Sequence, residues 1–307
     1  MLFRIVERKW WYFLFSGALL VPGIVFLMLG GLKPGIEFRG GTLLDLTFRT
    51  PPTSQEVYAV MNGLGHGDAL VQRAEGGRMI VRMGQLTPEQ EGAVERALEQ
   101  RFAQDVDRSS QTVSPSFSAE LVANAIRAVA AASILVVLLI AYAFRHLGWG
   151  AFRYGFAAMV AVVHDAVAVL GAFAILGHFL GVEVDSLFVT AVLTIIGFSV
   201  HDTIVVFDRI RENQKLYPGE ALNPVINFAV MQTMVRSVIT SLTTLLPLLA
   251  MYGFGGYSTR YFALALIVGL VSGSYSSIFN AAQVVSLWQE IEDKLRGRPR
   301  GAAPAAV

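Results

Sequence analysis

The sequence predicts a membrane protein: an all-α bundle of six membrane-spanning helices with a small α+β domain inserted after the first helix. Three observations predict this class. Hydrophobic residues make up 54% of the 307 residues, charged residues make up 15%, and the mean hydropathy is +0.55. Six stretches are apolar over about the 20 residues needed to cross roughly 30 Å of hydrocarbon. The long hydrophilic stretch, residues 33–118, alternates strand and helix signals.

The six predicted spans follow a one-plus-five arrangement around the hydrophilic stretch. The first is too long for the apolar core of a signal peptide and no small-residue cleavage pattern follows it, so we expect an uncleaved anchor. In chain order the predicted spans run from about Trp10 to Leu32, Leu121 to Phe144, Tyr154 to Phe179, Ser186 to Phe207, Ser237 to Tyr252 with a start as early as Phe228, and Tyr261 to Trp288.

The orientation of the bundle is predicted from its basic residues, which gather in connections on one side of the membrane. The short loops on the opposite side, at 180–185 and 253–260, contain a single basic residue, Arg260. Because cytoplasmic loops are enriched in Lys and Arg, both termini are expected to be cytoplasmic. This divides the chain into a cytoplasmic N-terminus with the first span (1–32), an extracytoplasmic domain (33–118), a five-helix membrane region (119–290) and a basic cytoplasmic tail (291–307). The basic residues on the cytoplasmic side are Arg4, Arg8, Lys9, Arg145, Arg153, Arg209, Arg211, Lys215, Lys294, Arg296, Arg298 and Arg300.

The hydrophilic stretch predicts a ferredoxin-like domain. Its elements occur in the order β-α-β-β-α-β, which is typical of that fold. Capping-box spacings at 53–56 and 87–90 mark the starts of two helices, and Gly76-Gly77 marks a hairpin. The expected elements are a strand at 42–49, a helix from 53 to about 64, strands at 68–73 and 78–83, a helix from 87 to about 102 and a last strand near 111–113.

Several function classes are excluded by composition. The chain has no cysteine, which rules out disulfides and thiolate chemistry. The net charge of +1 argues against a nucleic-acid partner. The hydrophilic domain has no nucleophile–base arrangement and no metal-ligand spacing, and we expect the chain to be neither an enzyme nor the holder of a bound metal or cofactor.

The fourth span contains the most informative residues, His201 and Asp202. An ionisable group at membrane depth costs roughly 2.5–3.5 kcal/mol and by default marks an ion, proton or substrate pathway. For His201 two interpretations stay open: a proton relay, or a neutral ring bonded to a carbonyl group.

A possible partner for Asp202 stands at the start of the fifth span. Arg236 is predicted at a depth similar to that of Asp202, and the two are expected to pair, either as a pair that opens on protonation or as a permanent ion pair that holds the bundle together. Hydroxyl groups follow on the same span, including those of Thr240 and Thr244. Because unpartnered polar groups are costly in lipid, this face should look into the bundle.

Asp165 lies near the middle of the third span, directly after His164. Two interpretations are open for it: a relay or packing role, or a simple hydrogen bond to neighbouring Ser or Thr. The residues alone therefore leave two classes of function, a proton-coupled transporter subunit and a non-titrating scaffold subunit, with a small-molecule efflux half as a third.

Five segments resemble the SecF family of bacterial protein-export membrane proteins, and together they cover essentially residues 1–290. These are residues 35–42 after the first span, 113–121 at the entry to the second, 198–213 in the fourth, 237–247 in the fifth and 273–279 in the sixth. One departure concerns His201, which stands where the family usually has Asn before the aspartate.

The resemblance implies half of a transporter of the resistance-nodulation-division (RND) type, paired with SecD into twelve spans beside the SecYEG channel. It implies an activity driven by the proton-motive force, without a cofactor, that completes export of a translocating preprotein across the lipid of the bacterial cytoplasmic (inner) membrane. The family's proton-path carboxylate corresponds to Asp202 and its membrane arginine to Arg236, with Thr240 and Thr244 as polar companions.

Overall fold

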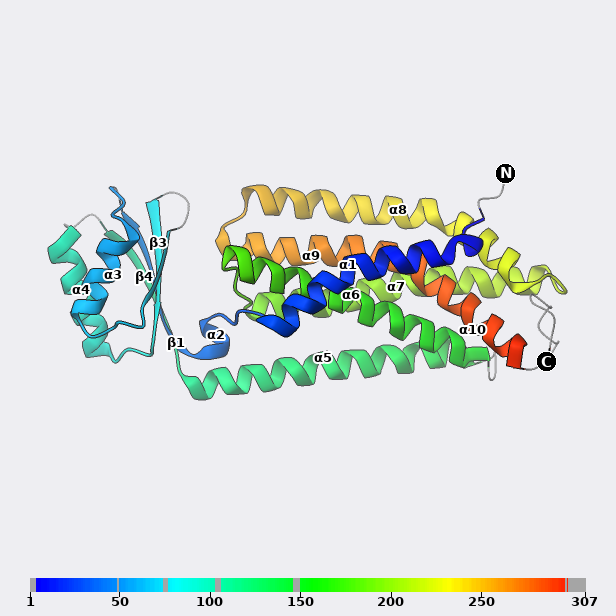
Figure 1. Cartoon of the computed structure of the whole chain (residues 1–307), viewed down its shortest axis with the longest axis horizontal. Coiled ribbons are helices and arrows are strands. Elements are labelled where there is room, and N and C mark those ends of the chain that lie inside the picture. Colours follow the sequence, from blue (N-terminus) through cyan, green and yellow to red (C-terminus); the bar gives the residue numbers. More distant parts are fainter. Residues whose placement is uncertain are drawn as a thin grey trace. The chain divides into compact units, whose positions relative to one another are not determined.

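The computed structural model describes residues 4–48, 50–73, 77–102, 106–145, 150–295 and 297 (Figure 1). It divides into two compact units, one of residues Met1–Lys33 with Arg127–Val307 and one of Pro34–Ile126. Arg49, Gly76 and most of the predicted basic tail, residues 296 and 298–307, lie outside the described residues.

The described residues contain six helical segments that are long and apolar enough to cross a membrane, in agreement with the predicted spans. Several helices are longer than the spans predicted, because a helix can continue into water where hydropathy no longer reports it. The last span is interrupted by one π-helical turn, which divides it into α9 and α10. The segments are α1 (Lys9–Leu29), α5 (Pro115–Ala143), α6 (Gly150–Leu180), α7 (Ser186–Leu216), α8 (Leu222–Phe254), and α9 (Tyr257–Ser276) with the π turn Ser277–Ala281 and α10 (Ala282–Leu295).

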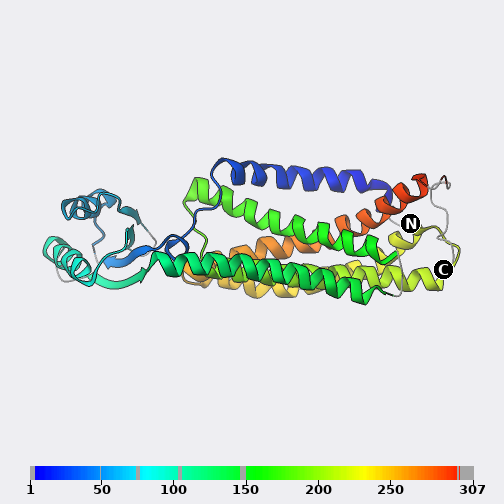
Figure 2. The same ribbon diagram turned by 90° about the horizontal axis from the view of Figure 1, so that it is seen from below.

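Helix α9 packs against α6, α7 and α8, whereas α1 lies along α6 (Figures 1 and 2). The contact between α1 and α6 depends on two glycines. A Cβ atom added to Gly23 would lie 2.7 Å from the Cα of Gly171, and one added to Gly171 would lie 2.6 Å from the Cα of Gly23. The two backbones therefore touch directly, as small residues permit in membrane helices.

The second unit contains a four-stranded antiparallel sheet in the order β2-β3-β1-β4, with two helices between its strands. This order confirms the predicted ferredoxin-like domain. The last strand begins earlier than the predicted start near Gln111, because its pairing with β1 extends to the pair Phe48–Val106. The elements are β1 (Gly41–Phe48), α3 (Ser54–Gly63), β2 (Leu70–Arg73), β3 (Arg78–Met83), α4 (Pro88–Phe102) and β4 (Val106–Val113), preceded by the single turn α2 (Ile36–Arg39).

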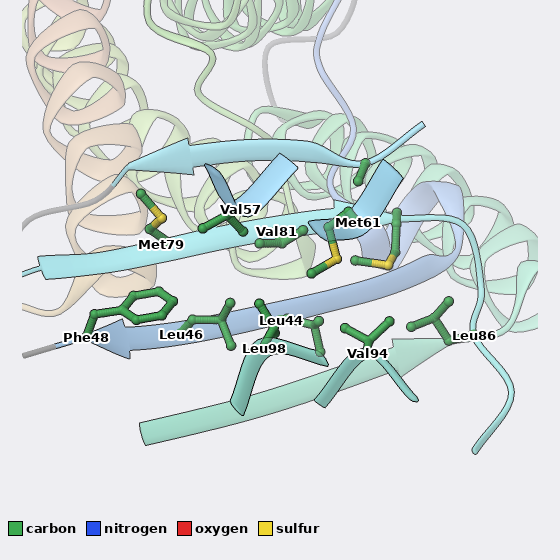
Figure 3. Packing of buried hydrophobic residues seen from close by; sticks show 12 residues of the cluster. Leu44, Leu46, Phe48, Val57, Met61, Met79, Val81, Leu86, Val94 and Leu98 are labelled. Carbon is green, nitrogen blue, oxygen red and sulfur yellow. The ribbon is translucent and has the colours of Figure 1, made fainter. Parts of the chain in front are cut away.

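The core of this unit lies between the sheet and its two helices. Figure 3 shows side chains of β1 and β3, among them Leu46 and Val81, gathered with Val57 of α3 and Leu98 of α4. Both predicted helix caps form. For example, the backbone N–H of Thr53 donates to the Glu56 carboxylate at 2.7 Å, and the backbone N–H of Glu56 donates to the Thr53 hydroxyl oxygen at 3.3 Å.

The turn between α2 and β1 requires glycine at two successive positions. Gly40 has φ +76° and Gly41 has φ +133°, values that side chains disfavour. A Cβ atom at Gly41 would also lie 2.6 Å from the carbonyl oxygen of Met83. This segment therefore tolerates no side chain where the chain enters the sheet.

Candidate functional site

Asp202 lies inside the membrane unit, with its carboxylate 5% exposed. The hydroxyl of Ser237, on the neighbouring helix α8, donates to Oδ1 at 3.1 Å. The second oxygen, Oδ2, is buried and has no hydrogen-bond partner among the described residues. Leaving a buried polar atom unpaired costs about 1–3 kcal/mol, and more for a charged group. The site therefore holds a carboxyl group that is poorly compensated when it is ionised.

The predicted ion pair between Asp202 and Arg236 is not formed among the described residues. Arg236 and His201 are both exposed in the isolated chain, although both are close enough to Asp202 to act on it electrostatically. The reason is helical geometry. Ser237 faces Asp202, and its neighbour Arg236 is turned about 100° around the helix axis, away from the carboxylate.

Helix α8 presents two polar stripes. Residues four apart lie on one face of a helix, so Arg236, Thr240 and Thr244 form an outer stripe. Thr240 and Thr244 are partly buried, and the Thr244 hydroxyl donates to the Thr240 carbonyl oxygen at 3.0 Å. Ser237 and Ser241 form the adjacent inner stripe. The hydroxyl oxygen of Ser241 lies 2.5 Å from that of Ser274 on α9, so the predicted inward-facing hydroxyls are these serines.

Asp165 occupies a second polar site, between α6, α7 and α9, where it is 1% exposed. Three serine hydroxyls donate to its carboxylate. Ser272 donates to Oδ1 at 2.7 Å, whereas Ser199 and Ser276 donate to Oδ2 at 2.5 and 2.7 Å. The hydrogen bonds of the second interpretation of Asp165 are therefore present. A relay role for this residue stays a prediction.

His164 completes this cluster. Its Nδ1 lies 3.0 Å from Oδ1 of Asp165, and its Nε2 is buried without a hydrogen-bond partner among the described residues. Sequence reasoning did not identify Ser272 and Ser276 as partners of Asp165. The available signal was their spacing of four residues in an otherwise apolar span, which places both hydroxyls on one face of α9.

A chain of hydroxyls connects α7 to the π-helical turn. The hydroxyl oxygens of Thr203 and Ser277 lie 2.9 Å apart, and the Ser277 hydroxyl donates to the carbonyl oxygen of Ser199 at 3.2 Å. Since a hydroxyl has one proton, Thr203 is the donor to Ser277. π-helical turns are rare overall, and those that do occur are often found at functional sites. Within the part of the chain that the structure describes, no group of His, Asp and Glu side chains is arranged to hold a metal ion.

The structure combines six apolar helices, which bury two carboxylates among serine hydroxyls, with a ferredoxin-like domain. This combination defines a multi-pass membrane protein of the transporter class. Comparisons with known families agree with this class. Residues 93–291 match the family described as protein export membrane protein SecD/SecF, C-terminal, and residues 25–52 match the SecD/SecF GG motif. The second match includes the paired glycines Gly40 and Gly41.

The chain aligns over nearly its whole length with curated relatives. The chain is 42% identical to the protein translocase subunit SecF of Thermobaculum terrenum over 95% of each chain. It is 38% identical to SecF of Anaerolinea thermophila over 99% of each chain. It is also 33% identical to the protein translocase subunit SecDF of Bacillus subtilis, over 94% of this chain and 38% of the relative.

Two solved structures have the same fold. The crystal structure of SecDF, a translocon-associated membrane protein from Thermus thermophilus, matches with a TM-score of 0.83 and 32% identity over 94% of this chain and 39% of the SecDF chain. A super-membrane-facing form of SecDF matches with a TM-score of 0.70 and 30% identity. The chain belongs to the SecF family of protein translocase subunits. The predicted fold class and the predicted role in protein translocation are thereby confirmed.

Proposed function

We propose that the chain couples the proton gradient to Sec-dependent protein export and that Asp202 is the group that takes up and releases the proton. The observation that carries this proposal is the environment of its carboxylate, which is buried, receives one hydroxyl hydrogen bond and has one oxygen without a partner among the described residues. A proton bound to this carboxyl group removes the buried charge. The site therefore favours the protonated form, and the ionised form needs a counter-charge to be stable there.

The outer stripe of α8 gives the proposed route its second component. When Asp202 is ionised, rotation of the long Arg236 side chain can bring its guanidinium toward the carboxylate. When Asp202 is protonated, that attraction is lost. Thr240 and Thr244 continue the polar stripe one and two turns beyond Arg236, and His201 directly precedes Asp202 at the surface of α7. We place Asp165 beside this route, connected to it through α7.

The exposed position of Arg236 favours a partner for this face of the bundle. A charged side chain facing lipid is costly, so the outer stripe of α8 requires a protein neighbour. The SecDF of Bacillus subtilis contains this chain's equivalent within a longer polypeptide, of which the matched part is 38%. We therefore propose that SecD covers this stripe and that the two chains form a twelve-span, RND-type assembly that acts on preproteins beside SecYEG.

The proposed location is the bacterial inner membrane. Both termini are in the cytoplasm, and the ferredoxin-like domain is on the extracytoplasmic side. The ammonium group of Lys9, at the start of α1, lies 2.5 Å from the carboxylate of Glu290 in α10. The two ends of the bundle thus lie on the same side, which is also the side of the basic connections. We propose that the proton gradient, without a bound cofactor, supplies the energy.

The test is export by cells in which the chain carries Asp202→Asn. The amide keeps the shape of the side chain and can accept from Ser237, but it does not titrate. We expect the variant to accumulate in the membrane with its partner and to lose the export that depends on the proton-motive force. Asp208→Asn, six residues along the same helix on an exposed side chain paired with Arg211, is the matched control and should export normally. Normal export by an accumulated Asp202→Asn protein would leave the scaffold interpretation in its place.

A further inference from the structure

The cluster around Asp165 carries an inference about how the proposed titrating group is held. We propose that Asp165 is a positioning residue: by binding Ser199 of α7, its carboxylate fixes the segment of α7 that presents Asp202. The proposal rests on the proposed function of Asp202 and assigns Asp165 a role outside the proton route.

Asp165 and Asp202, both buried within predicted apolar spans, have opposite hydrogen-bond environments. Asp202 receives one hydroxyl donor, and one of its oxygens has no partner among the described residues. Asp165 receives three hydroxyl donors, and Nδ1 of His164 lies 3.0 Å from Oδ1. With the His164 proton on Nδ1, a proton added to Asp165 would have to displace a donor or reverse a buried hydroxyl. The geometry therefore suits Asp165 to a fixed acceptor, whereas it suits Asp202 to a group that changes.

The donors to Asp165 come from two helices besides its own. Ser199 belongs to α7, whereas Ser272 and Ser276 belong to α9. One carboxylate on α6 thus connects α6, α7 and α9. Deep burial prevents water from replacing any of these donors, since Asp165 is 1% and Ser199 is 0% exposed.

The connection from this cluster to Asp202 is short. Ser199 precedes Asp202 by three residues, which is just under one helical turn and about 4.5 Å along α7. The same segment of α7 is held a second time from α9, because Ser277 donates to the Ser199 carbonyl oxygen and contacts the Thr203 hydroxyl. Hydrogen bonds therefore hold α7 at Ser199 and at Thr203, on both sides of Asp202 along the chain.

Gly273 allows this close approach. A Cβ atom added to it would lie 3.3 Å from the Cβ of Ser199 and 3.5 Å from Oδ2 of Asp165. The absence of a side chain at this position lets α9 bring its serines to both α6 and α7. Gly269, four residues earlier on α9, contacts a different part of α7, because a Cβ atom added to it would overlap the Cδ1 of Ile195.

The other titratable or charged groups at these two sites are few among the described residues. His164 adjoins Asp165 on α6, and the ring of Tyr275 from α9 lies 6.3 Å from the His164 ring. His201 on α7 and Arg236 on α8 act on Asp202. None of these residues is altered in the experiment below, so a change in pH dependence would report on the position of Asp202.

The experiment compares two serine deletions at the same carboxylate. Ser199→Ala and Ser272→Ala each remove one hydroxyl donor to Asp165, but only Ser199 is on the helix of Asp202. The chain is assembled with its partner in membrane vesicles, and export driven by an imposed proton gradient is measured as a function of pH. Ser199→Ala should shift the midpoint of the pH profile by about half a pH unit or more. Ser272→Ala should lower thermal stability to a similar extent and leave the midpoint within about 0.2 pH unit of wild type.

Unchanged midpoints in both variants, or equal shifts in both, would overturn the proposal, because the effect would then not pass through α7. Should Ser199→Ala fail to assemble, Gly273→Ala provides the same test, since its added methyl group presses on Ser199 without removing a hydrogen bond. A Gly273→Ala profile that coincides with wild type would likewise overturn the proposal. Asp202→Asn, measured in parallel, separates the two claims: if it exports with normal pH dependence, the proposed function itself has failed.

Discussion

At the scale of single residues, the main feature of this chain is that Asp165 and Asp202, both buried within predicted apolar spans, have different hydrogen-bond environments. Burial of a carboxylate requires hydrogen bonds or a counter-charge. Asp165 receives them from serines of α7 and α9, and it touches His164. Asp202 has Ser237 alone, and its second oxygen has no partner among the described residues. Because stability favours the first arrangement, the second is explained better by function than by packing.

A second residue-scale feature is the glycine contact between α1 and α6, which gives a prediction with a control on the same helix. Gly23→Ala should destabilise the bundle by about 1–3 kcal/mol, because the new methyl group meets the backbone of Gly171 and the helices must separate. Gly17→Ala should have little effect, since a Cβ atom there would have no neighbouring atom within 4 Å. The measurement is the thermal unfolding of the purified protein in detergent. Equal midpoints for the two variants would show that the α1–α6 contact contributes little.

At the scale of elements, the ferredoxin-like unit has a core of its own, so we predict that residues 36–115 fold without the membrane helices. A dispersed amide spectrum of this fragment is the expected result, and a collapsed spectrum would contradict it.

The fragment also allows a matched pair of truncations in the sheet. Leu46→Ala should cost about 2–5 kcal/mol because Leu46 is 1% exposed. Leu70→Ala should remain within about 0.5 kcal/mol, because Leu70 is 53% exposed.

The helix cap of α3 predicts a pH dependence for the same fragment. Hydrogen bonds from the Thr53 backbone N–H, and then from its hydroxyl, lower the pKa of Glu56 below its ordinary value of 4.5. Because the folded state lowers this pKa, the cap contributes stability that is fully present above the unfolded value and is lost as the pH falls through the folded value. The free energy of unfolding, measured in urea, should therefore fall more steeply for wild type than for Glu56→Gln as the pH is lowered from about 6 to about 3. Parallel pH curves for the two proteins would rule out the cap as the cause.

At the scale of the whole molecule, composition and hydropathy were sufficient to predict the fold class. Helix ends were harder to predict: α8 begins at Leu222, before both the predicted start near Ser237 and the earlier alternative near Phe228, because polar residues such as Gln232 continue the helix outside the apolar window. Strand β4 was underestimated for a similar reason. It is an edge strand with a polar sequence, so it lacks the alternation that marks buried strands.

The candidate site was predictable in part, for a physical reason. Asp165 and Asp202 stand out because acidic residues are rare in apolar spans, and a single span is enough to notice them. Their hydrogen-bond partners depend on which faces of different helices meet. The sequence of a single helix does not determine which face meets its neighbour. Arg236 was thus expected to face Asp202, although its neighbour Ser237 does so, and the serines of α9 were not assigned to Asp165.

The central claim is that Asp202, and not Asp165, changes its protonation state in the assembled membrane protein. Infrared difference spectroscopy between acidic and alkaline buffers tests this most directly, because a protonated carboxyl group has its own C=O stretching band. The samples are the chain with its partner in lipid bilayers, as wild type, Asp202→Asn and Asp165→Asn. We predict a carboxyl band that is present in wild type, absent in Asp202→Asn and retained in Asp165→Asn. A band that persists in Asp202→Asn and disappears in Asp165→Asn would contradict the claim.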